Sequence, residues 1–126
     1  MATITPLKIT EDGVTGAFGN CAGGGDEFTN SGVEFVRIYN GNASTRTVTV
    51  TAQTTNYYLP RYGKLTKSNI TKTVANGNTV FLGPFRPSVF NDASEKVQVT
   101  YVKTSDSSTI TGSHLLKIEV LYLEQK

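Results

Sequence analysis

The chain has 126 residues, of which 37% are hydrophobic and 17% charged, and its formal net charge is +2. This length suits one domain with a modest core. The 12 Lys and Arg residues are scattered, so no basic footprint for nucleic acid is visible. The single cysteine, Cys21, excludes an intramolecular disulfide and a Cys-based metal site.

Thr is the most frequent residue, and Gly and Asn are abundant, which favours strands joined by turns over helices. No stretch approaches the eighteen or so apolar residues of a membrane span. The first residues lack the basic and apolar regions of a secretory signal. We therefore expect a soluble protein made in a cytoplasm.

The first 31 residues differ in pattern from the rest. Residues 2–10 are extended in pattern, and Pro6 interrupts any ladder, so they predict an edge strand or a docking arm. Residues 11–31 carry six glycines and predict a long mobile loop. The sequence therefore suggests an N-terminal arm and Gly-rich loop over 1–31 and a β-sandwich domain over 32–126.

Strand patterns become dense after Gly32. Residues 33–40 place Val36 and Ile38 on one face, and residues 45–53 alternate valine with threonine. The intervening Asn40-Gly41-Asn42 is a turn sequence, so these two segments predict a hairpin. A polar-aromatic connection (54–64) and an irregular strand (65–74) follow.

The stretch 76–102 combines two turns, two strands and a rigid corner. Asn76-Gly77 predicts a turn before a short apolar strand at 79–82. The prolines of Gly83-Pro84-Phe85-Arg86-Pro87 remove two backbone donors, so pairing must stop there or move to an edge. Val97, Val99 and Tyr101 then alternate with polar residues, as in a half-buried strand.

The last strand, predicted over 114–123, is apolar on both faces, so it should lie centrally or be covered. At least six strands at roughly ten-residue spacing, without helical periodicity, indicate a β-sandwich or a small barrel. We predict an all-β, single-domain antiparallel β-sandwich, jelly-roll or immunoglobulin-like, with an extended N-terminal arm.

Catalytic chemistry has weak candidates. His114 is the only histidine and would need distant, unspecified partners for a Ser-His-Asp arrangement. Cys21 lies near Asp26 and Glu27, whose charges would raise its pKa and oppose a reactive thiolate. We predict that the chain is not an enzyme and holds no metal or cofactor.

The acidic pairs Glu11-Asp12 and Asp26-Glu27 are sequence neighbours, and neighbours on an extended chain point to opposite sides. A calcium site built on Asp26 and Glu27 would lack the alternating ligands of a dedicated loop. The repeated glycines between residues 13 and 25 resemble a phosphate loop, but neither a helix pattern nor a Lys-Ser/Thr pair follows.

Tyr57, Tyr58 and Tyr62, with Arg61 and Lys64, could stack a sugar or a base. Packing in an interface or beneath a loop is the simpler alternative. The absence of tryptophan weakens the carbohydrate interpretation.

Two stretches carry a resemblance to a protein family. Residues 26–51 (DEFTNSGVEFVRIYNGNASTRTVTVT) and 80–101 (VFLGPFRPSVFNDASEKVQVTY) resemble segments of the small β-sandwich decoration, or cement, proteins of tailed-phage capsids. Together they cover about half the chain. The resemblance implies a virion protein, made in the host cytoplasm, that binds the major capsid protein on the outside of the shell as a trimer or a dimer. It implies no nucleic-acid or membrane partner.

Such a protein needs surface to bury. We expect the capsid contact to involve Thr3, Ile4, Leu7 and Ile9 of the N-terminal segment, with the corner residues Phe85 and Arg86 as further candidates. An internal role for the corner, with Phe85 capping the core, is an equal alternative. Candidates for self-association are Tyr57, Tyr58, Tyr62 and Leu121. The rival function is a carbohydrate- or receptor-binding module of a phage tail, which predicts an exposed aromatic platform on one sheet face.

Overall fold

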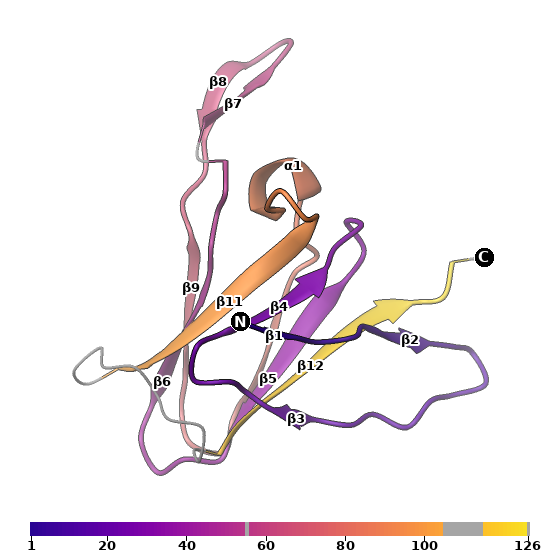
Figure 1. Cartoon of the computed structure of the whole chain (residues 1–126), viewed down its shortest axis with the longest axis vertical. Coiled ribbons are helices and arrows are strands. Elements are labelled where there is room, and N and C mark those ends of the chain that lie inside the picture. The colour runs from indigo at the N-terminus through magenta and orange to yellow at the C-terminus, as the bar shows by residue number, and fades with distance from the viewer. Residues whose placement is uncertain (55, 105–114, 126) are drawn as a thin grey trace.

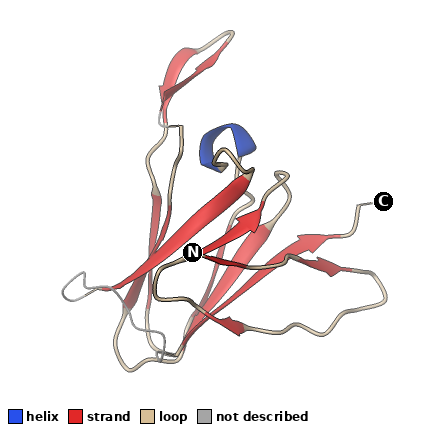
Figure 2. Cartoon of the chain, viewed as in Figure 1, coloured by secondary structure: helices blue, strands red, loops and turns tan. Residues whose placement is uncertain are grey.

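A computed structural model describes residues 1–54, 56–104 and 115–125, without the side chains of 56–59, 65 and 66. Two sheets pack face to face, and a small hairpin stands apart from them (Figures 1 and 2). Sheet A contains, in spatial order, β1 (Ala2–Thr3), β4 (Asp26–Thr29), β11 (Lys96–Lys103), β6 (Arg46–Val50) and β9 (Ile70–Val74). Sheet B contains β10 (Thr79–Leu82), β5 (Phe35–Asn40), β12 (Leu116–Leu123) and β2 (Leu7–Ile9), and β3 (Gly19–Asn20) also pairs with β12. The hairpin consists of β7 (Asn56–Leu59) and β8 (Gly63–Thr66), and α1 (Pro87–Phe90) is a single helical turn.

The strand pairing is nested. β3 pairs with β12, β4 with β11, β5 with β10, and β6 with β9, all antiparallel. Successive pairs alternate between the two sheets, as in a ribbon of paired strands wrapped around a core, which is the jelly-roll arrangement. The predicted β-sandwich is therefore confirmed. The sheets are mixed, because β1 runs parallel to β4 and β2 parallel to β12.

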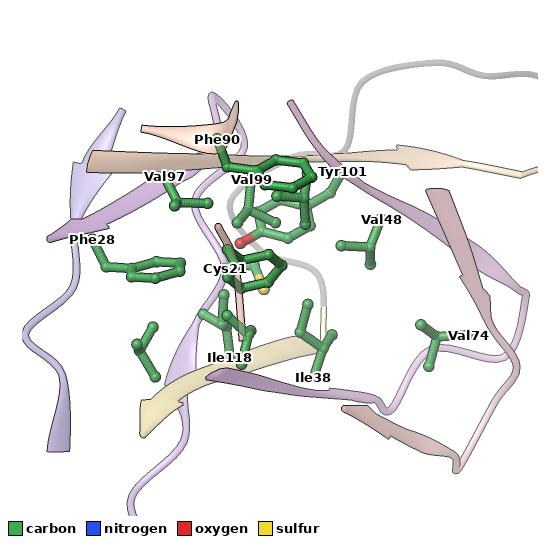
Figure 3. Packing of buried hydrophobic residues seen from close by; sticks show 14 of the residues in the cluster. Cys21, Phe28, Ile38, Val48, Val74, Phe90, Val97, Val99, Tyr101 and Ile118 are labelled. Carbon is green, nitrogen blue, oxygen red and sulfur yellow. The ribbon is translucent and has the colours of Figure 1, made fainter. Parts of the chain in front are cut away.

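The core forms where the inward residues of the two sheets meet (Figure 3). The alternation predicted from sequence holds, since Val97, Val99 and Tyr101 of β11 face Val36 and Ile38 of β5 across fully or nearly fully buried space. A polar contact lies at one side of this core. There the Tyr101 hydroxyl donates to Asp26 Oδ2 over 2.7 Å, and the Ala22 amide donates to the same oxygen over 3.0 Å.

The predicted hairpin over 33–53 is wrong. β5 belongs to sheet B and β6 to sheet A, so Asn40-Gly41-Asn42 carries the chain from one sheet to the other. The Asn76-Gly77 turn also crosses between sheets, and the two crossings are joined, because the Gly77 amide donates to the Asn40 carbonyl over 2.7 Å. At the junction Asn40 is fully buried, and its Nδ2 donates to the carbonyls of Ser44 and Val74.

The division at residue 31 is also corrected. Residues 1–31 supply β1 to β4, so they form part of the sandwich. Of the two alternatives predicted for residues 2–10, an edge strand or a docking arm, the structure shows edge strands: β1 pairs with β4, β2 pairs with β12, and Pro6 lies between them. The Gly-rich segment 11–31, predicted as a long loop, contains the strands β3 and β4. Gly25 adopts a φ of +97°, and a Cβ there would lie 2.8 Å from the Val99 carbonyl oxygen.

The corner at 83–87 ends β10 with a cis Gly83–Pro84 peptide bond, and α1 follows. Phe85 points inward with 1% of its surface exposed, and its ring lies 6.0 Å from that of Phe28 and 5.8 Å from that of Phe90. The internal alternative for the corner is the one that the structure shows.

Candidate interaction surface

The outer face of sheet B is partly covered by the segment 10–18, between β2 and β3. Beneath it, Arg37 of β5 and Glu119 of β12 are cross-strand neighbours joined by an ion pair of 2.5 Å. Glu119 Oε1 also accepts the Ala17 amide over 3.2 Å, and the Phe18 ring lies 4.2 Å from the guanidinium carbon of Arg37. A Cβ at Gly16 would lie 2.6 Å from Arg37 Nη2, so the chain passes very close to this pair. The segment predicted to be mobile is thus folded onto the sheet by an ion pair, a hydrogen bond and a cation–π contact.

Two hollows flank this covering segment, and Glu119 lines both. One, of about 290 Å³, lies between β2 and β3 and is lined mostly by small and aliphatic residues. The other, of about 320 Å³, lies between the covering segment and the outward side chains of Leu7, Ile9 and Leu121. Both are shallow and carry few polar groups, so they offer space for apolar contact and little for chemistry.

Apolar side chains of sheet B, of the end of the covering segment and of the residue before β12 are exposed together on this face. Phe81 of β10 is 64% exposed, Leu115 52%, Phe18 37% and Tyr39 36%. Phe81 lies opposite Arg37 in the β10–β5 register, and the Phe18 and Tyr39 rings are 6.3 Å apart. Tyr39 and Leu115 both lie next to Gly41, within 3.3 Å of where a Cβ would stand on that residue. We call these four residues the aromatic patch. The outer face of sheet A is different, because threonines fill its cross-strand rows, such as Thr100, Thr49 and Thr71.

The four residues predicted for capsid contact in the N-terminal segment lie in two environments. Thr3 is exposed at the outer edge of sheet A. Ile4 packs against the core, so it contributes to folding and offers little to a partner. Leu7 and Ile9 are half-buried along the edge of sheet B.

Two further predicted contact residues are buried. Phe85 lies in the core, and Leu121 is 6% exposed among β2 and the covering segment. Both predictions are corrected, because each side chain is already used inside the fold. Arg86, by contrast, is exposed beside the corner.

The predicted tyrosine cluster falls on the β7–β8 hairpin. Tyr62 is at its tip and is 75% exposed, while the side chains of Tyr57 and Tyr58 lie outside the described part of the structure. β7 and β8 pair with each other as a separate sheet, and Figure 1 shows them standing away from the sandwich.

Cys21, Asp26 and Glu27 are the reactive groups considered from sequence whose contacts the structure describes. Cys21 is buried, and burial raises its pKa to about 12, with the nearby Asp26 charge adding to the rise. Asp26 faces inward to Tyr101, while Glu27 faces outward, with its carboxylate 3.7 Å from Lys96 Nζ, so this acidic pair does not converge. His114 lies outside the described residues. Within 1–54, 56–104 and 115–125, no three His, Cys, Asp or Glu side chains are grouped to hold a metal ion.

No protein-family model, curated protein or solved structure matches this chain. Among the described residues, no helix has the length and apolar character needed to cross a membrane. The function of this surface therefore follows from the residues that form it.

The aromatic patch was not predicted as a site. Both Phe81 and Tyr39 fall in predicted strands, and Tyr39 is on the face opposite Val36 and Ile38, but the sequence does not show that this sheet face is left partly uncovered. The signal was the pairing of Phe35, Arg37 and Tyr39 on the face opposite Val36 and Ile38, since large outward residues on a strand require a cover or a partner.

Proposed function

We propose that this chain is a structural virion protein that binds the outside of a tailed-phage head and stabilises contacts between neighbouring major capsid subunits, without catalysing a reaction. The starting point is the resemblance of residues 26–51 and 80–101 to capsid decoration proteins. The observation that carries the proposal is the aromatic patch, which leaves large apolar side chains in solvent on one sheet face.

The patch is large enough to matter energetically. At roughly 200 Å² per large side chain, the exposed fractions amount to roughly 370 Å² of surface. Burying that area would contribute on the order of 9 kcal/mol at about 25 cal/mol per Å², before the costs of association. Patches of this size on small proteins commonly mark interaction sites.

A decoration protein stabilises a shell by linkage, because it binds the assembled lattice better than free subunits. Contact with several subunits at once, by a trimer or a dimer of this chain, would multiply a modest affinity per contact. The exposed edge of β1 at Thr3 offers backbone groups for strand addition beside the patch-bearing sheet.

The test uses undecorated heads of the tailed phage whose genome encodes the chain. Purified protein is added, binding is measured by co-sedimentation, and shell melting by calorimetry. We expect saturable binding and a raised melting temperature. Phe81→Ser should weaken binding by about 2–3 kcal/mol, since Phe81 has most of its surface to bury.

The matched control is Thr73→Ala, which changes an exposed residue of sheet A and should leave binding intact. Wild-type protein that neither binds heads nor raises their melting temperature contradicts the proposal. Equal binding by the Phe81 and wild-type proteins removes the patch from it.

A second candidate is a carbohydrate- or receptor-binding module, because it requires an exposed aromatic platform and Phe81, Tyr39 and Phe18 provide one. Phenylalanine lacks the polar group that tyrosine and tryptophan offer to a sugar, which favours a protein partner. Binding of the isolated domain to a glycan array, lost in Phe81→Ser, would support this second function over the first.

A further inference from the structure

The ten carboxylate residues of the chain occupy two blocks with a gap between them. No Asp or Glu occurs from residue 35 to residue 91, although this stretch holds seven Lys and Arg residues. Arg37 is paired with Glu119, and Arg46 is buried. The remaining five are exposed: Arg61, Lys64, Lys67, Lys72 and Arg86.

The fold brings four of these cations to one end of the molecule. Arg61 and Lys64 lie on the β7–β8 hairpin, Lys67 follows β8, and Arg86 precedes α1. Figure 1 shows the hairpin and α1 at the same end of the sandwich. We call these four residues the basic end. Because Lys and Arg are scattered evenly along the sequence, this grouping could not be predicted from the sequence. Asp92 and Glu95 follow α1 at this end, and the Asp92 carboxylate is occupied by hydrogen bonds from Ser94, Lys96 and Gln98.

A hollow of about 290 Å³ lies within the basic end. Lys67 and Arg86, nineteen positions apart, both line it, and the other lining residues are Ile70, Pro84, Val89 and Phe90. Two cations thus border a small space with apolar walls.

The β7–β8 hairpin, which precedes Lys67 in the chain, has little support from the rest of the described structure. β7 and β8 form their own two-stranded sheet, and a two-stranded hairpin alone is marginally stable in water. Its tip presents Tyr62, 75% exposed, between Arg61 and Lys64. Contact with a partner would therefore stabilise the hairpin as well as the complex.

From this arrangement we infer that the basic end binds an acidic segment of a partner protein, in which carboxylates alternate with apolar side chains. A carboxylate of that segment lies between the positive charges of Lys67 and Arg86, which border the hollow. An adjacent apolar side chain rests on Ile70 and Pro84, and further carboxylates approach Arg61 and Lys64. This inference rests on the proposed function and specifies the chemistry of the partner surface.

A protein segment fits better than nucleic acid. Affinity for a duplex grows with the number of phosphates neutralised along a track. The basic end has four cations spread over a hairpin and a hollow, and the hollow has apolar walls. Duplex DNA is therefore a competing probe in the test.

The experiment titrates the full chain with a short synthetic peptide of alternating Glu and Leu, by calorimetry, at low and high salt. Its Lys–Leu counterpart and a DNA duplex are titrated in parallel. We expect the Glu–Leu peptide alone to bind, with affinity falling as salt rises. Lys67→Glu/Arg86→Glu should weaken binding at least about tenfold, because it reverses the charge on both sides of the hollow.

The matched control is Lys8→Glu/Lys103→Glu, which makes the same change in net charge at exposed positions elsewhere and should bind normally. Equal peptide binding by the two double variants, no binding of the Glu–Leu peptide by wild-type protein, or tighter binding of the duplex overturns the inference.

The same variants added to undecorated heads separate the two proposals. Wild-type protein that binds the peptide through the basic end but ignores heads contradicts the proposed function alone. Wild-type and Lys67→Glu/Arg86→Glu proteins that bind heads equally well overturn the basic-end inference and leave the proposed function standing.

Discussion

Replacing Asn40 should destabilise the protein more than any substitution at an exposed asparagine. Its side chain is fully buried where the two inter-sheet crossings meet. Nδ2 donates to the Ser44 carbonyl over 3.0 Å and to the Val74 carbonyl over 2.8 Å, while Oδ1 accepts the Asn42 amide over 2.9 Å. One short side chain therefore holds three backbone groups from two connections.

In Asn40→Ala the Val74 carbonyl loses its buried donor, which costs about 2 kcal/mol, and two partly buried bonds to Ser44 and Asn42 add about 0.5 kcal/mol each. We expect the free energy of unfolding to fall by about 3 kcal/mol, a large part of the total stability of a small domain. Urea denaturation followed by circular dichroism measures this change. The control Asn78→Asp, at an exposed position, should stay within about 0.5 kcal/mol of wild type.

Asn40→Asp tests the direction in which stability changes with pH. Its carboxyl would be buried facing two carbonyl oxygens, so the pKa in the folded state should lie above the unfolded value of about 3.9. The variant should then be least destabilised below about pH 4 and lose stability as pH rises towards neutrality. A cost below about 1 kcal/mol for Asn40→Ala, or identical pH profiles for the two variants, would refute the assigned role.

Three further predictions concern other contacts. Glu119→Ala leaves Arg37 without its partner and should cost about 2–3 kcal/mol, with faster amide exchange in the covering segment, measured by mass spectrometry. Gly25 and Gly13 both have positive φ, so alanine is strained at either site, but only at Gly25 would the new Cβ also meet backbone. Gly25→Ala should therefore be more destabilising than Gly13→Ala in thermal unfolding, by at least about 1 kcal/mol. Burial raises the pKa of Cys21 from 9.0 to about 12, so the thiol of the folded protein should react only slowly with a thiol reagent at pH 8, and rapid labelling would contradict this. For the same reason the free energy of unfolding should fall as pH rises above about 9, and Cys21→Ala should partly remove this fall.

Patterns of period two were sufficient to find β5 and β11 with their inward faces, but they missed β3 and β4, which lie in the segment predicted as a loop. Val36, Ile38, Val97, Val99 and Tyr101 all face the core as predicted. The last strand, apolar on both faces, lies inside sheet B with part of its outer face covered, as its composition required. These features depend on local alternation and burial, which a single sequence displays.

The alternation of apolar residues could not predict which strands pair with each other. Asn40-Gly41-Asn42 has the local chemistry of a hairpin turn, yet the chain there passes between sheets. The contacts that accompany this crossing are distant in sequence, since the Asn40 side chain donates to the Val74 carbonyl across 34 positions. Turn chemistry specifies a reversal of the chain, and the choice of partner strand depends on contacts far away in sequence.

The candidate surface was predicted least well, and for a related reason. Phe85 and Phe81 are both phenylalanines near one proline corner, but one is 1% and the other 64% exposed. Only the packing of Phe85 against Phe28 and Phe90 separates them. Similarly, the glycines before Phe18 suggested mobility, whereas Gly16 permits the chain to pass over the Arg37–Glu119 pair.

The nested pairing has a consequence for synthesis on the ribosome. β2 and β3 are translated well before β12, beside which they lie, and Ala17 reaches its acceptor on Glu119 across 102 positions. Until β12 is translated, the nascent chain therefore holds β2 and β3 without the strand that they pair with. Closure of these long loops should be slow, so the nascent chain is most exposed to aggregation before β12 is made.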